Sequence, residues 1–132
     1  MTSARILLVV NALTFLCLGA WSLAAPETVA SFIDLGLNTA TARADFMAFY
    51  GGFEVGFGLF LGACAARAEW VRPGLVGLGL GLLGAGLGRL AGMLTDGPVK
   101  GNMASFLAFE LIGAALCAIC LLWLSRMKTP AA

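Results

Sequence analysis

The chain has 132 residues, of which 61% are hydrophobic and 11% are charged, and its mean hydropathy is +0.97. These values exclude an ordinary soluble domain. Eight Lys and Arg residues against seven Asp and Glu residues, without runs of either sign, exclude a nucleic-acid-binding surface. The chain contains no His, which removes the commonest general base and the usual ligand of catalytic zinc and haem.

Four stretches are apolar over the length that a membrane-spanning helix needs, which is about 20 residues for about 30 Å of hydrocarbon. They cover residues 6–25, 46–66, 74–94 and 103–124. Strands are a poorer interpretation, because these runs lack the period-2 alternation of membrane barrels. The sequence therefore predicts an all-α, polytopic membrane four-helix bundle that forms a single domain over residues 1–132.

The segment 26–36 follows the first span and has apolar residues at helical spacing. It predicts a short amphipathic helix in the outer interface of the membrane. The first span has an alternative interpretation as a signal peptide, because Ser22-Leu23-Ala24 resembles a cleavage site. Its full length of about 20 apolar residues favours an uncleaved helix.

Basic residues predict the orientation, because positively charged flanks are retained in the cytoplasm. Only Arg43 and Lys100 flank the spans at one end of the predicted bundle. Five basic residues flank them at the other end: Arg5, Arg67, Arg72, Arg126 and Lys128. Both termini are therefore expected in the cytoplasm.

Glycines recur every fourth residue in the second and third spans, as in Gly58-x-x-x-Gly62 and Gly84-x-x-x-Gly88-x-x-x-Gly92. Small residues allow close backbone approach between helices in lipid. The spacing predicts that these two helices pack tightly against each other.

Three ionisable residues, Glu54, Arg89 and Glu110, lie within the spans, where each costs about 2.5–3.5 kcal/mol at a helix centre. At 1.5 Å per residue they lie about 12, 8 and 10 Å from the outer ends of their helices. The shared depth predicts contact in one polar layer of the outer half. The predicted polar network also includes residues that share helix faces with these three. Arg43 and Tyr50 lie in a stripe that ends at Glu54, and Asp96 lies on the face of Arg89.

Two interpretations of this polar network stay open. In the first, Glu54, Arg89 and Glu110 form a structural ion triad that specifies which helices meet. In the second they form a binding site, since two carboxylates against one guanidinium leave an excess negative charge for a proton or a cation to neutralise. In the inner half, Asn11 and Thr14 are expected to form interhelical hydrogen bonds.

We predict no catalytic residue, no metal site and no cofactor. The four cysteines lie within apolar spans and are expected to pack as small hydrophobic residues. A copper(I) site stays an alternative, formed either by the sulfur atoms of Cys117 and Cys120 or by Met47, Met93 and Met103 near the outer surface.

The segment Tyr50-Gly51-Gly52-Phe53-Glu54, followed by Gly88-Arg89 and Asp96-Gly97, resembles a large family of small bacterial four-helix membrane proteins whose domain has no assigned function. The resemblance covers nearly the whole chain and implies four spans in a bacterial inner membrane, with no established activity or cofactor. A looser architectural likeness to DoxX-like and sterol-isomerase-like four-helix proteins implies a lipophilic ligand with a polar or cationic head group.

Three functions therefore compete. The first is a non-enzymatic protein that binds a lipid-like molecule or serves as an accessory subunit of a larger membrane complex. The second is a small oligomeric transporter. The third is an isomerase-type enzyme in which Glu54 or Glu110 donates a proton.

Overall fold

The computed structural model describes residues 2–96 and 102–126, except for the side chain of Asp96. Its elements are α1 (Thr2–Ala24), α2 (Pro26–Phe32), α3 (Ala40–Phe46), the π-helix η1 (Met47–Phe53), α4 (Glu54–Ala66), the 3-10 helix η2 (Ala68–Trp70), α5 (Val71–Asp96) and α6 (Met103–Arg126). The described residues contain no strand, so the predicted all-α fold is confirmed.

Four helical segments, Thr2–Ala24, Ala40–Ala66, Ala68–Thr95 and Met103–Arg126, are long and apolar enough to cross a membrane. The protein is therefore a multi-pass membrane protein. Most of its large hydrophobic side chains are exposed on the surface of the bundle, as expected where the solvent is lipid.

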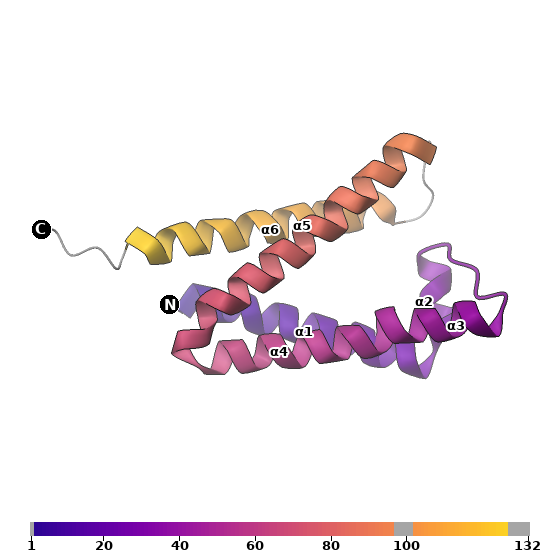
Figure 1. The fold of residues 1–132 in the computed structure, drawn as a ribbon, viewed down its shortest axis with the longest axis horizontal. Coiled ribbons are helices and arrows are strands. Elements are labelled where there is room, and N and C mark those ends of the chain that lie inside the picture. The colour runs from indigo at the N-terminus through magenta and orange to yellow at the C-terminus, as the bar shows by residue number, and fades with distance from the viewer. Residues whose placement is uncertain (1, 97–101, 127–132) are drawn as a thin grey trace, which may run out of the picture.

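The helices form two hairpin-like pairs, since the most extensive contacts join α1 to α4 and α5 to α6 (Figure 1). α4 and α5 meet at η2 and diverge toward the C-terminal end of α5 (Figure 1). We call the end that carries η2 and the start of α1 the η2 end, and the end that carries α2 and α3 the α3 end. The apolar core lies toward the η2 end, where Leu8, Leu61, Leu75 and Leu78 are fully buried.

Glycines bring α1 and α4 together. A Cβ atom at Gly19 would lie 2.8 Å from the backbone nitrogen of Val55, and one at Gly58 would lie 2.9 Å from the carbonyl oxygen of Ala12. Only a residue without a side chain allows this approach.

The expected tight packing of the second span on the third is present only next to η2, where a Cβ atom at Gly74 would lie 2.6 Å from the Cβ atom of Cys64. Farther along α5 the prediction is wrong. Gly77 and Gly81 of α5 face the rings of Phe60 and Phe57, not the backbone of α4. At three further glycines of α5, an added Cβ atom would have no atom of the described chain within 4 Å: Gly84, Gly88 and Gly92. The physical reason is that bulky phenylalanines of α4 separate the two backbones at the level of Gly77 and Gly81, whereas α1 offers α4 a close partner.

The segment between the first two spans differs in detail from the prediction. The short helix after Pro26 is present but ends at Phe32, before the expected end at Gly36. Asp34 is left-handed with φ 56°, and the N–H groups of Asp34 and Leu35 donate to Ser31 and Ala30. This pattern closes a helix C-terminus.

The second membrane helix begins earlier than expected, at Ala40, because the side chain of Thr39 accepts a hydrogen bond of 3.0 Å from the N–H of Ala42. It then passes through the π-helix η1 before α4 begins at Glu54. The π-helix was not predicted, and it lies directly before the acidic residue that the sequence analysis singled out.

Candidate functional site

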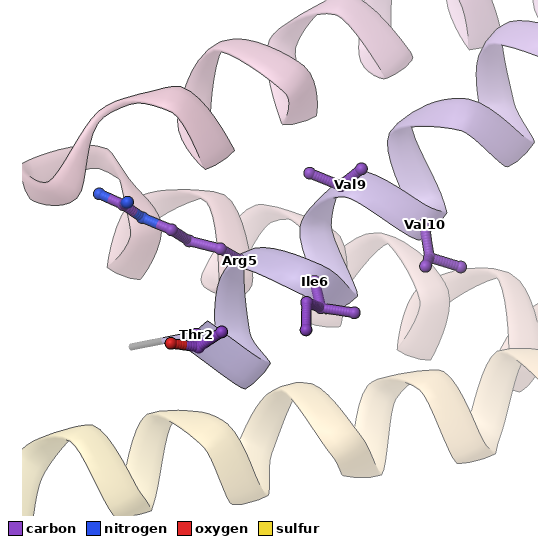
Figure 2. A pocket seen from close by; sticks show the side chains of 5 residues that line it. All are labelled: Thr2, Arg5, Ile6, Val9 and Val10. Atoms are coloured by element: carbon purple, nitrogen blue, oxygen red, sulfur yellow. The ribbon is translucent and has the colours of Figure 1, made fainter.

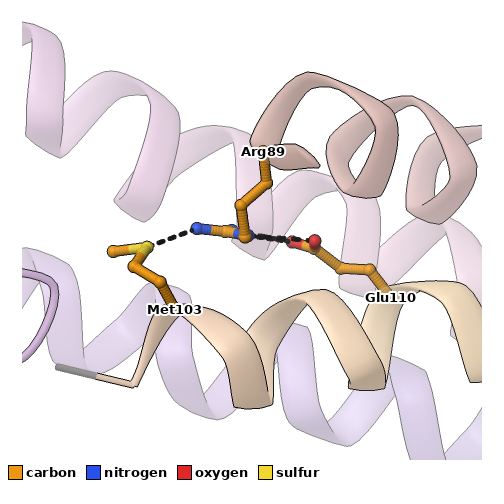
Figure 3. Close-up of polar contacts among 3 residues, drawn as sticks. All are labelled: Arg89, Met103 and Glu110. Carbon is orange, nitrogen blue, oxygen red and sulfur yellow. Dashed lines mark hydrogen bonds and ion pairs between the residues drawn. The ribbon is translucent and has the colours of Figure 1, made fainter. Parts of the chain in front are cut away.

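Arg89 of α5 and Glu110 of α6 form an ion pair within the bundle (Figure 3). Nη2 of Arg89 donates to Oε1 of Glu110 at 2.7 Å, and Nε donates to Oε2 at 3.0 Å. The two side chains retain 25% and 10% of their exposure, respectively. Two parallel hydrogen bonds between guanidinium and carboxylate give this pair a fixed geometry.

Arg89 also contacts two other residues of α6. Nη1 donates to the sulfur atom of Met103 at 2.9 Å (Figure 3), and the guanidinium lies 5.5 Å from the centre of the Phe106 ring. Met103 and Phe106 precede Glu110 by seven and four residues, so all three share one face of α6. Phe106 was not predicted from the sequence, although its spacing of four residues from Glu110 places it on the same helix face.

Close packing of α5 on α6 positions this pair. A Cβ atom at Gly86 would lie 3.4 Å from the Cβ atom of Glu110, so the absence of a side chain there brings the carboxylate up to α5. Arg89 follows Gly86 by three residues and lies on the same face. Gly79 faces Cys117 in the same way, which supports a packing role for this cysteine.

Glu54 does not join the pair, although the sequence predicted contact among all three residues. Its Oε2 atom is buried and has no hydrogen-bond partner among the residues that the structure describes. Glu54 precedes the fully buried Leu61 by seven residues and therefore faces the interior of the bundle. The polar layer thus consists of a satisfied ion pair and a separate, unsatisfied carboxyl group.

Arg43 and Tyr50, two other predicted members of the network, form no hydrogen bond or ion pair with Arg89 or Glu110. Arg43 forms an ion pair with Glu27 of α2, and both side chains are about half exposed. Tyr50 stacks on Phe46 with ring centres 4.7 Å apart. The side chain of Asp96 lies outside the described residues.

The π-helix explains why the predicted stripe from Arg43 to Glu54 is not formed. The stripe assumed 3.6 residues per turn throughout. A π-turn closes i to i+5 hydrogen bonds and therefore contains more residues per turn, so residues before and after η1 no longer share the predicted face. Tyr50 instead lines a hollow of about 280 Å³ with Leu37, Asp45 and Phe49.

Polar residues of the first helix also differ from expectation. Asn11 and Thr14 donate to the carbonyl oxygens of Leu7 and Val10, each at 2.9 Å within α1, so the predicted interhelical bonds are wrong. A hydroxyl or amide N–H donor can bond to the carbonyl four residues earlier without a partner helix. The Oδ1 atom of Asn11 is buried and has no hydrogen-bond partner among the described residues. The described residues contain no group of three Cys, Asp or Glu side chains that could hold a metal ion.

The protein-family model described as "Domain of unknown function (DUF4345)" matches residues 3–124. The chain therefore belongs to this family, which confirms the resemblance at the level of the family. No curated protein and no solved structure matches the chain. The looser likeness to DoxX-like and sterol-isomerase-like proteins stays a prediction.

Proposed function

We propose that this member of the DUF4345 family is a non-enzymatic protein of the bacterial inner membrane that binds an amphipathic molecule through Glu54. The observation that carries the proposal is the buried Oε2 atom of Glu54, which has no partner within the described part of the chain. An unpaired carboxyl group in hydrocarbon is costly, so a group from outside the chain is expected to satisfy it.

The surroundings of Glu54 indicate the chemistry of the ligand. Glu110 neutralises the charge of Arg89, whose Nη1 atom also donates to Met103, and Arg43 is paired with Glu27. The ligand must therefore supply its own positive charge or hydrogen-bond donor. Phe53 and Phe57, which stack at 5.9 Å beside Glu54 on the same helix, offer apolar surface to the rest of the molecule.

The backbone next to Glu54 supports a binding role. η1 ends at Phe53, directly before Glu54, and π-helical turns occur frequently at functional sites. Basic residues of the described chain concentrate at the η2 end, where Arg5, Arg67 and Arg72 lie. This distribution supports the proposal that both termini are cytoplasmic.

An accessory subunit is the second candidate, and the open glycines of α5 favour it. No neighbouring atom of the described residues lies within 4 Å of a Cβ position at Gly84, Gly88 or Gly92, so a helix of another protein could approach this face closely. In this case the partner helix supplies the donor to Glu54.

The test is the identification of small molecules that remain with the purified protein. Protein extracted in mild detergent is denatured with organic solvent, and the released molecules are compared by mass spectrometry with those from Glu54→Gln. A lipophilic molecule with a cationic or donor head group, present in the wild type and depleted in Glu54→Gln, is the expected result. Glu27→Gln is the control because Glu27 lies in the exposed pair with Arg43. Equal profiles for all three proteins would reject ligand binding at Glu54.

A further inference from the structure

A second feature lies on α1 at the opposite end of the bundle from Glu54. It is a hollow of about 310 Å³ lined by Thr2, Arg5, Ile6, Val9 and Val10 (Figure 2). Thr2, Ile6 and Val10 are four residues apart, as are Arg5 and Val9, so the five cover a single face of the helix. The proposed function does not use any of them.

The lining of the hollow is amphipathic along its length. The polar groups of Thr2 and Arg5 lie toward the start of α1, and the aliphatic side chains of Ile6, Val9 and Val10 follow farther along the helix (Figure 2). Ile6 and Val10 are 58% and 54% exposed, so the rest of the described chain does not cover them. A molecule that fits this surface has a polar head group and an alkyl chain.

Arg5 determines the charge of that head group. Its Nε atom is buried and has no hydrogen-bond partner among the described residues, and no described carboxylate forms an ion pair with it. A guanidinium offers several donors in a planar arrangement that matches phosphate oxygens. The hydroxyl group of Thr2 adds a further donor at the same end of the hollow.

We propose that this hollow binds an anionic phospholipid, with its phosphate at Arg5 and Thr2 and one acyl chain along Ile6, Val9 and Val10. The charge favours an anionic lipid over a zwitterionic one, because a choline group carries a positive charge that the Arg5 side chain repels. The position at the beginning of the first span matches the level at which head groups meet hydrocarbon.

The test is a lipid titration of the delipidated protein in non-ionic detergent, followed by native mass spectrometry. Phosphatidylglycerol and phosphatidylcholine with the same acyl chains are the two probes. Phosphatidylglycerol is expected to bind about fivefold more tightly or better, which corresponds to one basic residue near the membrane surface. Equal binding of the two lipids would overturn the proposal.

Three variants locate the binding site. Arg5→Gln removes the charge, and Val9→Trp fills the apolar part of the hollow without changing the charge; both are expected to lose the preference for phosphatidylglycerol. Arg67→Gln is the matched control, because Arg67 lies over the ring of Trp70 at 4.6 Å and not in the hollow. A loss with Arg67→Gln equal to that with Arg5→Gln would show only non-specific attraction and overturn the proposal.

Two further readouts separate this proposal from other outcomes. Glu54→Gln is expected to retain phosphatidylglycerol binding, so failure of the ligand site at Glu54 does not affect this test. If the wild type is a dimer that Val9→Trp converts to a monomer without any change in lipid preference, the face binds a second copy of the chain and the lipid proposal is wrong. Circular dichroism of each variant checks that the helices are retained.

Discussion

Glu54 and Glu110 are two acidic residues of the membrane spans with opposite surroundings. Glu110 accepts two short hydrogen bonds from Arg89, whereas Oε2 of Glu54 has no partner within the described chain. Removal of a charge that is hydrogen-bonded leaves its partner buried without a bond, which lowers stability. Removal of an unpaired charge eliminates the free-energy cost of burying that charge. Substitution of the two residues should therefore affect stability differently.

We expect Glu110→Gln to lower the free energy of unfolding by about 3–5 kcal/mol, since it leaves the Arg89 guanidinium without a counter-charge inside the bundle. Glu54→Gln should change it by less than about 1 kcal/mol, because no hydrogen bond of the described chain is lost. Unfolding by sodium dodecyl sulfate in mixed micelles measures both. If Glu54→Gln unfolds the protein as severely as Glu110→Gln does, Glu54 has a structural role and the binding proposal loses its support.

Arg43 provides a contrasting prediction for an exposed ion pair. Its partner Glu27 and Arg43 itself are 60% and 48% exposed, so solvent screens their attraction. Arg43→Gln should lower stability by about 0–1 kcal/mol and leave the retained small molecules unchanged. The same unfolding assay and the solvent extraction of bound molecules measure the two effects. A depletion of ligand in Arg43→Gln would show that Arg43 belongs to the site after all.

At the scale of helices, glycines have different roles that their spacing alone does not reveal. A Cβ atom at Gly19 would lie 2.8 Å from the backbone nitrogen of Val55, whereas one at Gly62 would have no neighbouring atom of the described chain within 4 Å. We expect Gly19→Ala to cost about 1–3 kcal/mol, because two backbones must move apart. Gly62→Ala should be neutral or stabilise by up to about 1 kcal/mol through helix propensity. Equal effects of the two substitutions in the unfolding assay would contradict this assignment of the α1 and α4 interface.

The helices also show which local features the sequence could predict. The lengths of the apolar stretches predicted all four spans, because the thickness of the hydrocarbon layer sets the number of apolar residues that a spanning helix needs. The π-helix η1 was missed because no residue pattern specifies it, and it altered the positions of Tyr50 and Arg43 relative to Glu54. The depth of a residue in the membrane follows from the number of residues between it and the end of its helix. The direction of its side chain also depends on the number of residues in each helical turn.

The contact between Arg89 and Glu110 was predicted correctly from their shared depth. The same argument wrongly predicted that Glu54 joins this contact. Depth places three residues in one layer without stating which helices are neighbours in that layer. α5 and α6 pack closely through Gly86, whereas Phe57 and Phe60 hold α4 away from α5. The pairing of Arg89 with Glu110 therefore depends on side-chain volumes in three helices. The depth of a residue in its helix does not contain this information.

At the scale of the whole molecule, the distribution of basic residues predicts cytoplasmic termini. Alkaline phosphatase fused after Ala132 should be inactive, and a green fluorescent protein fused at the same point should fluoresce. The same two reporters inserted between residues 36 and 38, in the segment that joins α2 to α3, should show the reverse pattern. Phosphatase activity at Ala132 would invert the protein and put Glu54 in the inner half of the membrane.

The central claim is that Glu54 binds something that the chain itself does not provide. Native mass spectrometry of the protein, extracted gently from its own membrane, tests it most directly because it reports small adducts and partner subunits together. We predict that the wild type carries a stoichiometric adduct of lipid-like mass, or a partner subunit, that is lost in Glu54→Gln and retained in Arg43→Gln. A wild-type chain that is free of any adduct or partner would contradict the claim.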